Sequence, residues 1–155
     1  MHSRVMAMLE VPGRFTMLVP DGHGWRVTQQ GSTYELTKPG DEGALHISEF
    51  ERGGSGLGDD EAAQLLGRFI ATMGGTEDAG ARVMKESRSQ HRAVARFPVV
   101  DGASSFEVLA FLVLWRDRFL MCSCTADAGS AVLDEAEQMF ATIFAPRKGL
   151  LRRRG

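Results

Sequence analysis

Two cysteines and four histidines are the side chains of this sequence best suited to nucleophilic or metal chemistry. Cys122 and Cys124 stand two residues apart in an apolar run, so on a strand both side chains point to the same face. Neighbours placed in this way rarely reach disulfide geometry, and no nearby cysteine or histidine completes a zinc site. We therefore interpret both thiols as small buried hydrophobic groups, which is how free cysteines usually behave.

The histidines are dispersed along the chain, at His2, His23, His46 and His91. His46 alternates with Leu45 and Ile47, so on a strand its ring should point away from the core side chains. No His-x3-His spacing and no grouping of histidine with carboxylates occurs. The sequence therefore predicts neither a metal site nor a histidine-based catalytic triad.

The glycine-rich stretch GGSGLG at residues 53–58 precedes a predicted helix, and a helix N-terminus favours anions. Its spacing matches neither GxGxxG nor GxxxxGK[ST], and Ser55 does not stand in GxSxG. The acids that follow it, Asp59, Asp60 and Glu61, would repel phosphate. We interpret the stretch as a connection between a strand and a helix, and we expect no cofactor and no enzymatic activity.

Three aromatic residues, Trp25, Tyr34 and Trp115, are best able to line a pocket or an interface, although core packing is the simpler interpretation. Trp115 lies at the turn end of its predicted strand beside Arg116 and Arg118. An Arg–Trp–Arg cluster suits a protein interface, where arginine and tryptophan are enriched. These five residues are the binding candidates that the sequence provides.

Composition and charge indicate one ordinary globular domain of 155 residues, with 43% hydrophobic and 25% charged residues. The net charge of −2 gives no bulk attraction for nucleic acid, which we do not expect as a partner. Residues 147–155 contain five of the 18 basic residues and no acid, so residues 1–146 carry 13 basic against 20 acidic side chains. We expect residues 147–155 to be a disordered, solvated basic tail.

No signal-peptide pattern occurs near the beginning of the sequence, where the apolar stretch is broken by Glu10 and Pro12. The longest apolar run, residues 108–115, is much shorter than the roughly 20 residues that span a bilayer. These features predict a cytoplasmic protein without stable membrane insertion.

Hydrophobic alternation predicts strands over residues 15–19, 25–30, 33–38 and 44–50, joined as an antiparallel meander. A helix follows, capped by Asp59 or Asp60, with apolar residues at helical spacing up to Gly74 and Gly75. Residues 1–13 are predicted to be an arm or an edge strand.

The second half repeats the pattern, with strands over residues 82–89, 91–100, 106–115 and 119–125. The strand over residues 106–115 is apolar on both faces in its second half and should lie centrally in the sheet, whereas Pro98 is awkward in a central strand. A final helix is capped within residues 127–130 and stopped by Pro146. The order predicts an α+β fold, with about six or seven antiparallel strands and two helices in one domain over residues 14–146.

This order and two local phrases resemble the PsbP-like domain, which is shared by a photosystem extrinsic subunit, a Ran-binding nuclear import factor, DcrB-like proteins and effector-associated chaperones of type VI secretion. The phrases are FTMLVPDGHGW at residues 15–25, and the hairpin end at residues 118–124 followed by LDEAEQMFATI at residues 133–143. The resemblance implies an α/β sandwich and a small, usually non-enzymatic binding or adaptor module.

The functional expectation is therefore a small adaptor that presents a sheet face or cleft to a protein partner. One alternative is a chaperone or immunity-type partner of a secreted effector, and another is a small-molecule-binding domain. The sequence also leaves a homodimer open.

Overall fold

The computed structural model describes residues 6–20, 25–37, 44–52, 60–75, 82–87 and 90–145. The glycine-rich stretch at 53–58, Asp59, His2, His23 and the basic residues 147–155 lie outside the described residues. The architecture is α+β, as the sequence predicts.

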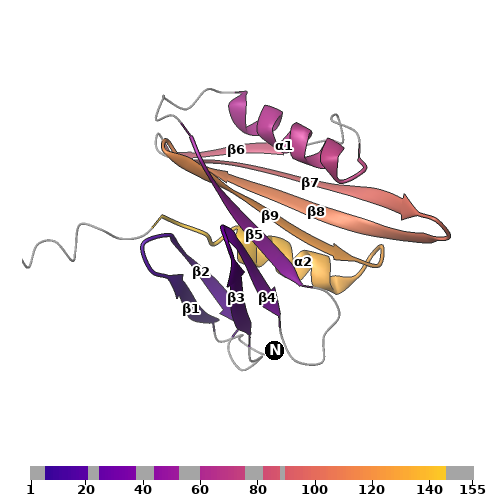
Figure 1. Cartoon of the computed structure of the whole chain (residues 1–155), viewed down its shortest axis with the longest axis horizontal. Coiled ribbons are helices and arrows are strands. Elements are labelled where there is room, and N and C mark those ends of the chain that lie inside the picture. Colours follow the sequence, from indigo (N-terminus) through magenta and orange to yellow (C-terminus); the bar gives the residue numbers. More distant parts are fainter. Residues whose placement is uncertain are drawn as a thin grey trace, which may run out of the picture.

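Seven antiparallel strands form the large sheet, in the order β3-β4-β5-β9-β8-β7-β6 (Figure 1). The strands are β3 (Arg26–Gln30), β4 (Thr33–Thr37), β5 (Leu45–Glu51), β6 (Arg82–Ser87), β7 (Gln90–Asp101), β8 (Ser104–Leu114) and β9 (Arg118–Ala126). The last hairpin, β8–β9, joins the two halves of the sheet because β5 pairs with β9 along its whole length.

Strand β8 is buried on both faces, which confirms its predicted central position. Leu109, Phe111 and Val113 belong to one apolar cluster, whereas Ala110 and Leu112 belong to a second cluster on the opposite face. The alternation of side chains along a strand thus divides the core into two layers.

Helix α1 (Glu61–Thr72) covers one face of the large sheet over β6, β7 and β8 (Figure 1). Its apolar stripe includes Leu66 and Ile70, and it ends where Gly74 takes the left-handed φ of +96° that glycine tolerates. Asp60 stands at the N-cap position, but its side chain makes no capping hydrogen bond. The predicted position of the helix start and the place of Glu61 in the first turn are confirmed, whereas a side-chain cap from Asp60 is absent. Glu61 forms an ion pair with Arg52.

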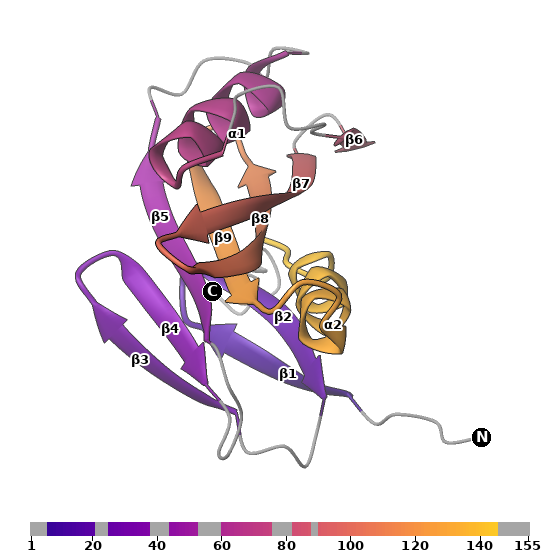
Figure 2. The ribbon, with the colours of Figure 1, turned by 90° about the vertical axis from the view of Figure 1, so that its right-hand side faces the viewer.

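Helix α2 (Ala131–Phe140) lies on the opposite face of the sheet, as the 90° view shows (Figure 2). Ser130 caps it as predicted, because its Oγ accepts a hydrogen bond from the backbone N–H of Val132 at 3.2 Å. The buried residues Leu133, Met139 and Phe140 face the core. In the described part of the chain, no helix is long and apolar enough to cross a membrane.

A second, two-stranded sheet is formed by β1 (Met6–Val11) and β2 (Phe15–Pro20), and lies beside α2 on the same face of the large sheet (Figures 1 and 2). The expected meander is therefore wrong at its first step, because β2 pairs with β1 and not with β3. Phe15 and Met17 are buried in the core cluster that the large sheet and α2 share. Burying these side chains places β2 over the core, whereas residues 6–11 form an edge strand.

Candidate functional site

Two of the predicted binding residues lie in or against the core of the α2 side. Tyr34 is 3% exposed, and its ring meets Phe15 edge to face at a centroid distance of 5.5 Å. Trp25 is half-buried against the same cluster, just before β3. Both positions agree with core packing, and any binding role for them stays a prediction.

The turn between β8 and β9 brings Trp115 and Arg118 together, but mainly beneath the surface. Trp115 is buried, and its Nε1 donates a hydrogen bond to Oε1 of Gln90 at 2.7 Å. The guanidinium of Arg118 lies over the Trp115 ring, 4.7 Å from its centroid. Arg118 also donates to Glu49 at 3.2 Å and to the backbone oxygen of Arg14 at 2.6 Å. This arrangement fastens the β1–β2 turn to the end of the large sheet.

Arg116 is exposed at the same turn, and its backbone oxygen accepts a hydrogen bond from Arg52 at 2.7 Å. Arg52 also donates to the backbone oxygen of Trp115 at 3.1 Å and pairs with Glu61. Arg52 thus connects the turn between β8 and β9 to the first turn of α1. Of the predicted Arg–Trp–Arg cluster, the structure leaves the Arg116 side chain at the surface.

The two cysteines and His46 take the positions that the sequence predicts, whereas His91, for which the sequence predicts no position, is buried. Cys122 and Cys124 are buried and form no disulfide bond, and burial raises the pKa of the Cys122 thiol far above its usual range, which keeps it neutral. His46 points outward, with its Nε2 3.2 Å from Glu35. Among the described residues, no three potential metal ligands come together.

The outer face of the small sheet contains a groove that the candidate residues of the sequence do not include. Along β2, Phe15 and Met17 turn inward to the core, whereas Thr16 and Leu18 turn outward and are only partly covered. On β1, Met8 and Glu10 share this outer face, because side chains alternate along both strands. These residues form one wall and the floor of the groove.

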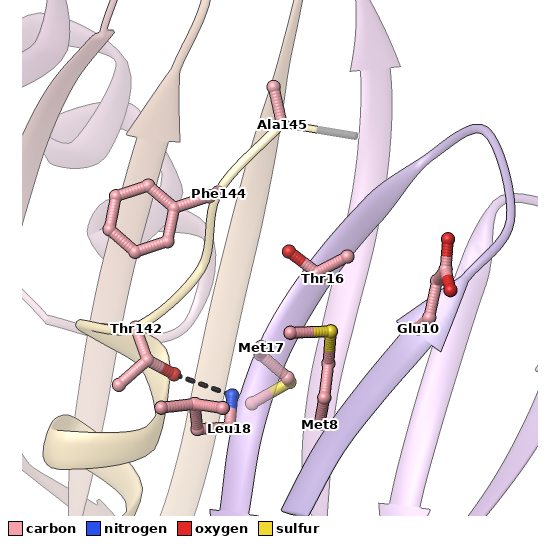
Figure 3. A pocket seen from close by; sticks show the side chains of 8 residues that line it. All are labelled: Met8, Glu10, Thr16, Met17, Leu18, Thr142, Phe144 and Ala145. Carbon is pink, nitrogen blue, oxygen red and sulfur yellow. Dashed lines mark hydrogen bonds between the residues drawn. The ribbon is translucent and has the colours of Figure 1, made fainter. Parts of the chain in front are cut away.

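The second wall comes from residues 142–145, which follow α2 and run beside the other edge of β2. Thr16 and Phe144 exchange two backbone hydrogen bonds, of 3.0 and 2.9 Å. The backbone N–H of Leu18 donates to Oγ1 of Thr142 at 2.8 Å. Two segments that are more than 120 residues apart in the sequence are therefore held side by side (Figure 3).

The walls are exposed apolar side chains whose positions are fixed by the fold. Met8 is 62% exposed and Phe144 is 52% exposed. The guanidinium of Arg92 lies 5.0 Å from the centroid of the Phe144 ring and donates to the backbone oxygen of Ile143 at 2.9 Å. A buried cation on one face of an exposed ring holds that ring in place.

The groove encloses about 550 Å³ and is mostly apolar. Its lining is formed by Met8, Glu10, Thr16, Met17, Leu18, Thr142, Phe144 and Ala145 (Figure 3). Of these residues, Glu10 is the one with an ionisable side chain, and it makes no ion pair within the described part of the chain. Such a surface favours apolar side chains together with one positive charge.

A sequence signal for this groove exists in residues 6–11, MAMLEV. Ala7, Leu9 and Val11 pack on the core, yet the alternate positions also include the large apolar residues Met6 and Met8. A short edge strand that is apolar on both faces indicates a second contact surface. The contribution of Phe144 could not be read in this way, because it depends on the distant pairing with Thr16.

A second cavity, of about 390 Å³, lies between α2 and β7, where charges are already paired. Arg96 donates to Asp134 at 2.7 Å and to Glu137 at 3.1 Å. The hydrogen bond to Asp134 is the largest cause of a raised pKa for Arg96. This cluster fixes α2 on the sheet, so the small-sheet groove is the better candidate site.

No family model matches the sequence, and the search of curated proteins finds no match. Among solved structures, a crystal structure of a protein from Bacteroides thetaiotaomicron is similar, with a TM-score of 0.60 and 21% sequence identity. The similarity covers 92% of this chain and 49% of that chain, so this chain spans about half the length of the similar protein. At this identity, the likeness shows the α+β fold alone.

Proposed function

We propose that the protein is a binding module that holds a short apolar segment of a partner protein in the small-sheet groove. The observation that carries the proposal is the pair of exposed walls, Met8 and Phe144, fixed on either side of a floor formed by β2. Exposed apolar side chains that border one groove favour a protein contact, whereas isolated ones need no explanation.

The size of the groove supports a short segment over a folded domain. Eight residues line it, whereas a stable interface between folded proteins takes about 20–30 residues on each side. The two walls stand on segments that flank β2, so they are about two strand spacings, or roughly 10 Å, apart. This width accommodates a single row of apolar side chains from a bound segment.

The PsbP-like resemblance supports the same class, because it implies a small binding or adaptor module. The proposal assigns no reaction to the groove. A dedicated chaperone of a secreted effector would use the groove in the same way, and this narrower role follows if the bound segment belongs to a secreted protein.

Photo-cross-linking in the cells that naturally make the protein tests the proposal. The photoreactive amino acid p-benzoylphenylalanine replaces Phe144 in one variant and Phe50 in the matched control. Both are exposed phenylalanines, at 52% and 44%, but Phe50 lies outside the groove and stacks on Phe119. We expect a discrete partner segment to be cross-linked from position 144 and not from position 50. Identical cross-linking patterns from the two positions would overturn the proposal.

The captured segment is then tested as a synthetic peptide with the purified protein. Met8→Glu places an unpaired carboxylate in the groove and should weaken binding at least about tenfold. Phe50→Glu makes the same kind of change outside the groove and should leave the affinity unchanged. Equal affinities for the two variants would show that the peptide binds elsewhere.

A further inference from the structure

The small-sheet groove ends at Ala145, and the chain continues directly into the basic residues 147–154. Leu150 is the fifth residue after Ala145 in the sequence, and five residues of extended chain span at most about 17 Å. The two walls of the groove are roughly 10 Å apart, by strand spacing. Residues 150–154 can therefore reach the groove from its own rim.

The composition of this segment matches the lining of the groove. Leu150 and Leu151 are an apolar pair, followed by three consecutive arginines at residues 152–154. The groove offers an apolar surface together with the carboxylate of Glu10, which makes no ion pair among the described residues. Two leucines and an adjacent cation are the chemical complement of that lining.

The distribution of charge favours the same contact. Residues 147–155 carry five positive charges and no negative charge, whereas the other 146 residues carry 13 basic and 20 acidic side chains. A basic segment is attracted to an acidic body, and the attraction falls as the salt concentration rises.

From these observations, we infer that residues 150–154 occupy the small-sheet groove of their own chain, with the leucines on its apolar surface and an arginine beside Glu10. The segment then competes with a partner for the groove, so partner binding requires its displacement. This inference rests on the same groove as the proposed function, but it concerns purified protein without a partner.

Cross-linking within the purified full chain tests the inference. The amino acid p-benzoylphenylalanine replaces Met8 in one variant and Val100 in the control. Both are exposed apolar strand residues, at 62% and 72%, and Val100 lies on β7 outside the groove. We expect peptides from residues 147–155 to be cross-linked from position 8, within single chains, and not from position 100. Equal yields from both positions, or products that link two chains only, would overturn the inference.

Charge reversal gives an independent measurement. Glu10→Lys should lower the yield of the position-8 cross-link about two- to fivefold, the range expected for one exposed ion pair. Glu51→Lys makes the same charge change at an exposed strand position outside the groove, and should leave the yield unchanged. An equal loss in both variants would indicate general attraction, and would contradict an arginine beside Glu10.

The two sets of results separate the inference from the proposed function. A partner cross-linked from position 144 in cells, with no cross-link to residues 147–155 in purified protein, supports the function and overturns the inference. A cross-link from position 8 to residues 147–155 in purified protein, with no partner cross-linked from position 144 in cells, supports the inference. That result would show a groove filled by its own chain and would overturn the proposed function.

Discussion

Glu49 is a buried acid that forms ion pairs with two arginines from distant parts of the chain. It accepts hydrogen bonds from Arg14 at 3.3 Å and from Arg118 at 3.2 Å, and its side chain is 8% exposed. Arg14 belongs to the turn between β1 and β2, and Arg118 begins β9. A single carboxylate therefore joins the small sheet to the large sheet.

Replacing Glu49 by alanine should destabilise the protein by about 2 kcal/mol, because Arg118 is largely buried and would lose its acidic partner. Arg118 keeps its bonds to backbone oxygens, which limits the loss. Urea denaturation measures the effect. Glu51→Ala, an exposed position on the same strand, should change the free energy of unfolding by less than about 0.5 kcal/mol. Equal effects of the two substitutions would contradict a structural role for the Glu49 pair.

At the scale of single residues, the sequence predicts side-chain types better than their partners. The spacing of Trp115, Arg116 and Arg118 is visible in the sequence, and the structure does bring Arg118 onto Trp115. Their other partners, Gln90 and Glu49, lie 25 and 69 residues away and belong to other strands. Without the sheet order, an interface and a buried polar network look alike in the sequence.

At the scale of elements, the end of α1 is fitted closely to β7. A methyl group added at Gly75 would lie 2.6 Å from Ile70 Cγ2 and 2.6 Å from the ring of Phe97. The backbone N–H of Gly75 also donates to the oxygen of Ile70 at 3.0 Å. Glycine is therefore required at position 75 because the side chains of Ile70 and Phe97 lie too close for a Cβ atom. At position 74, glycine is required because the backbone φ is positive.

Gly75→Ala should lower the free energy of unfolding by about 1–3 kcal/mol, the usual range for an overpacked core. The loss should be smaller in a Phe97→Leu background, because leucine lacks the ring atoms that the new methyl group would meet. Denaturation of the wild-type chain, both single variants and the double variant measures this coupling. Additive losses would show that the ring of Phe97 is not the obstacle.

Periodicity was enough to predict most elements, but not every assignment to a sheet. The apolar stripes of α1 and α2 and the alternation in β8 and β9 are strong local signals, and the structure confirms them. Among the described residues, β6 pairs with residues 90–94 of β7, so Pro98 lies beyond the paired part of that edge, where a proline is tolerated. The place of β2 in a separate sheet depends on Phe144 and α2, which local patterns do not indicate.

At the scale of the whole molecule, the large sheet is covered unevenly. One face is covered by α2 and the small sheet, whereas on the other face α1 contacts β6, β7 and β8 (Figure 2). Strand β3 is exposed at all of its positions and lies at the edge of the sheet. The described part of the chain therefore has a thick, doubly covered region around β8 and a thin β3–β4 end.

Uneven burial predicts uneven local stability, because free energies of local opening follow the apolar surface that holds each element. Native-state hydrogen exchange should show amides of β8 and β9 opening only with global unfolding. The hydrogen-bonded amides of β3 should exchange through local opening, at a lower free energy and with little dependence on low concentrations of denaturant. Equal protection and equal denaturant dependence in β3 and β8 would contradict this order, and would show that the thin end unfolds together with the core.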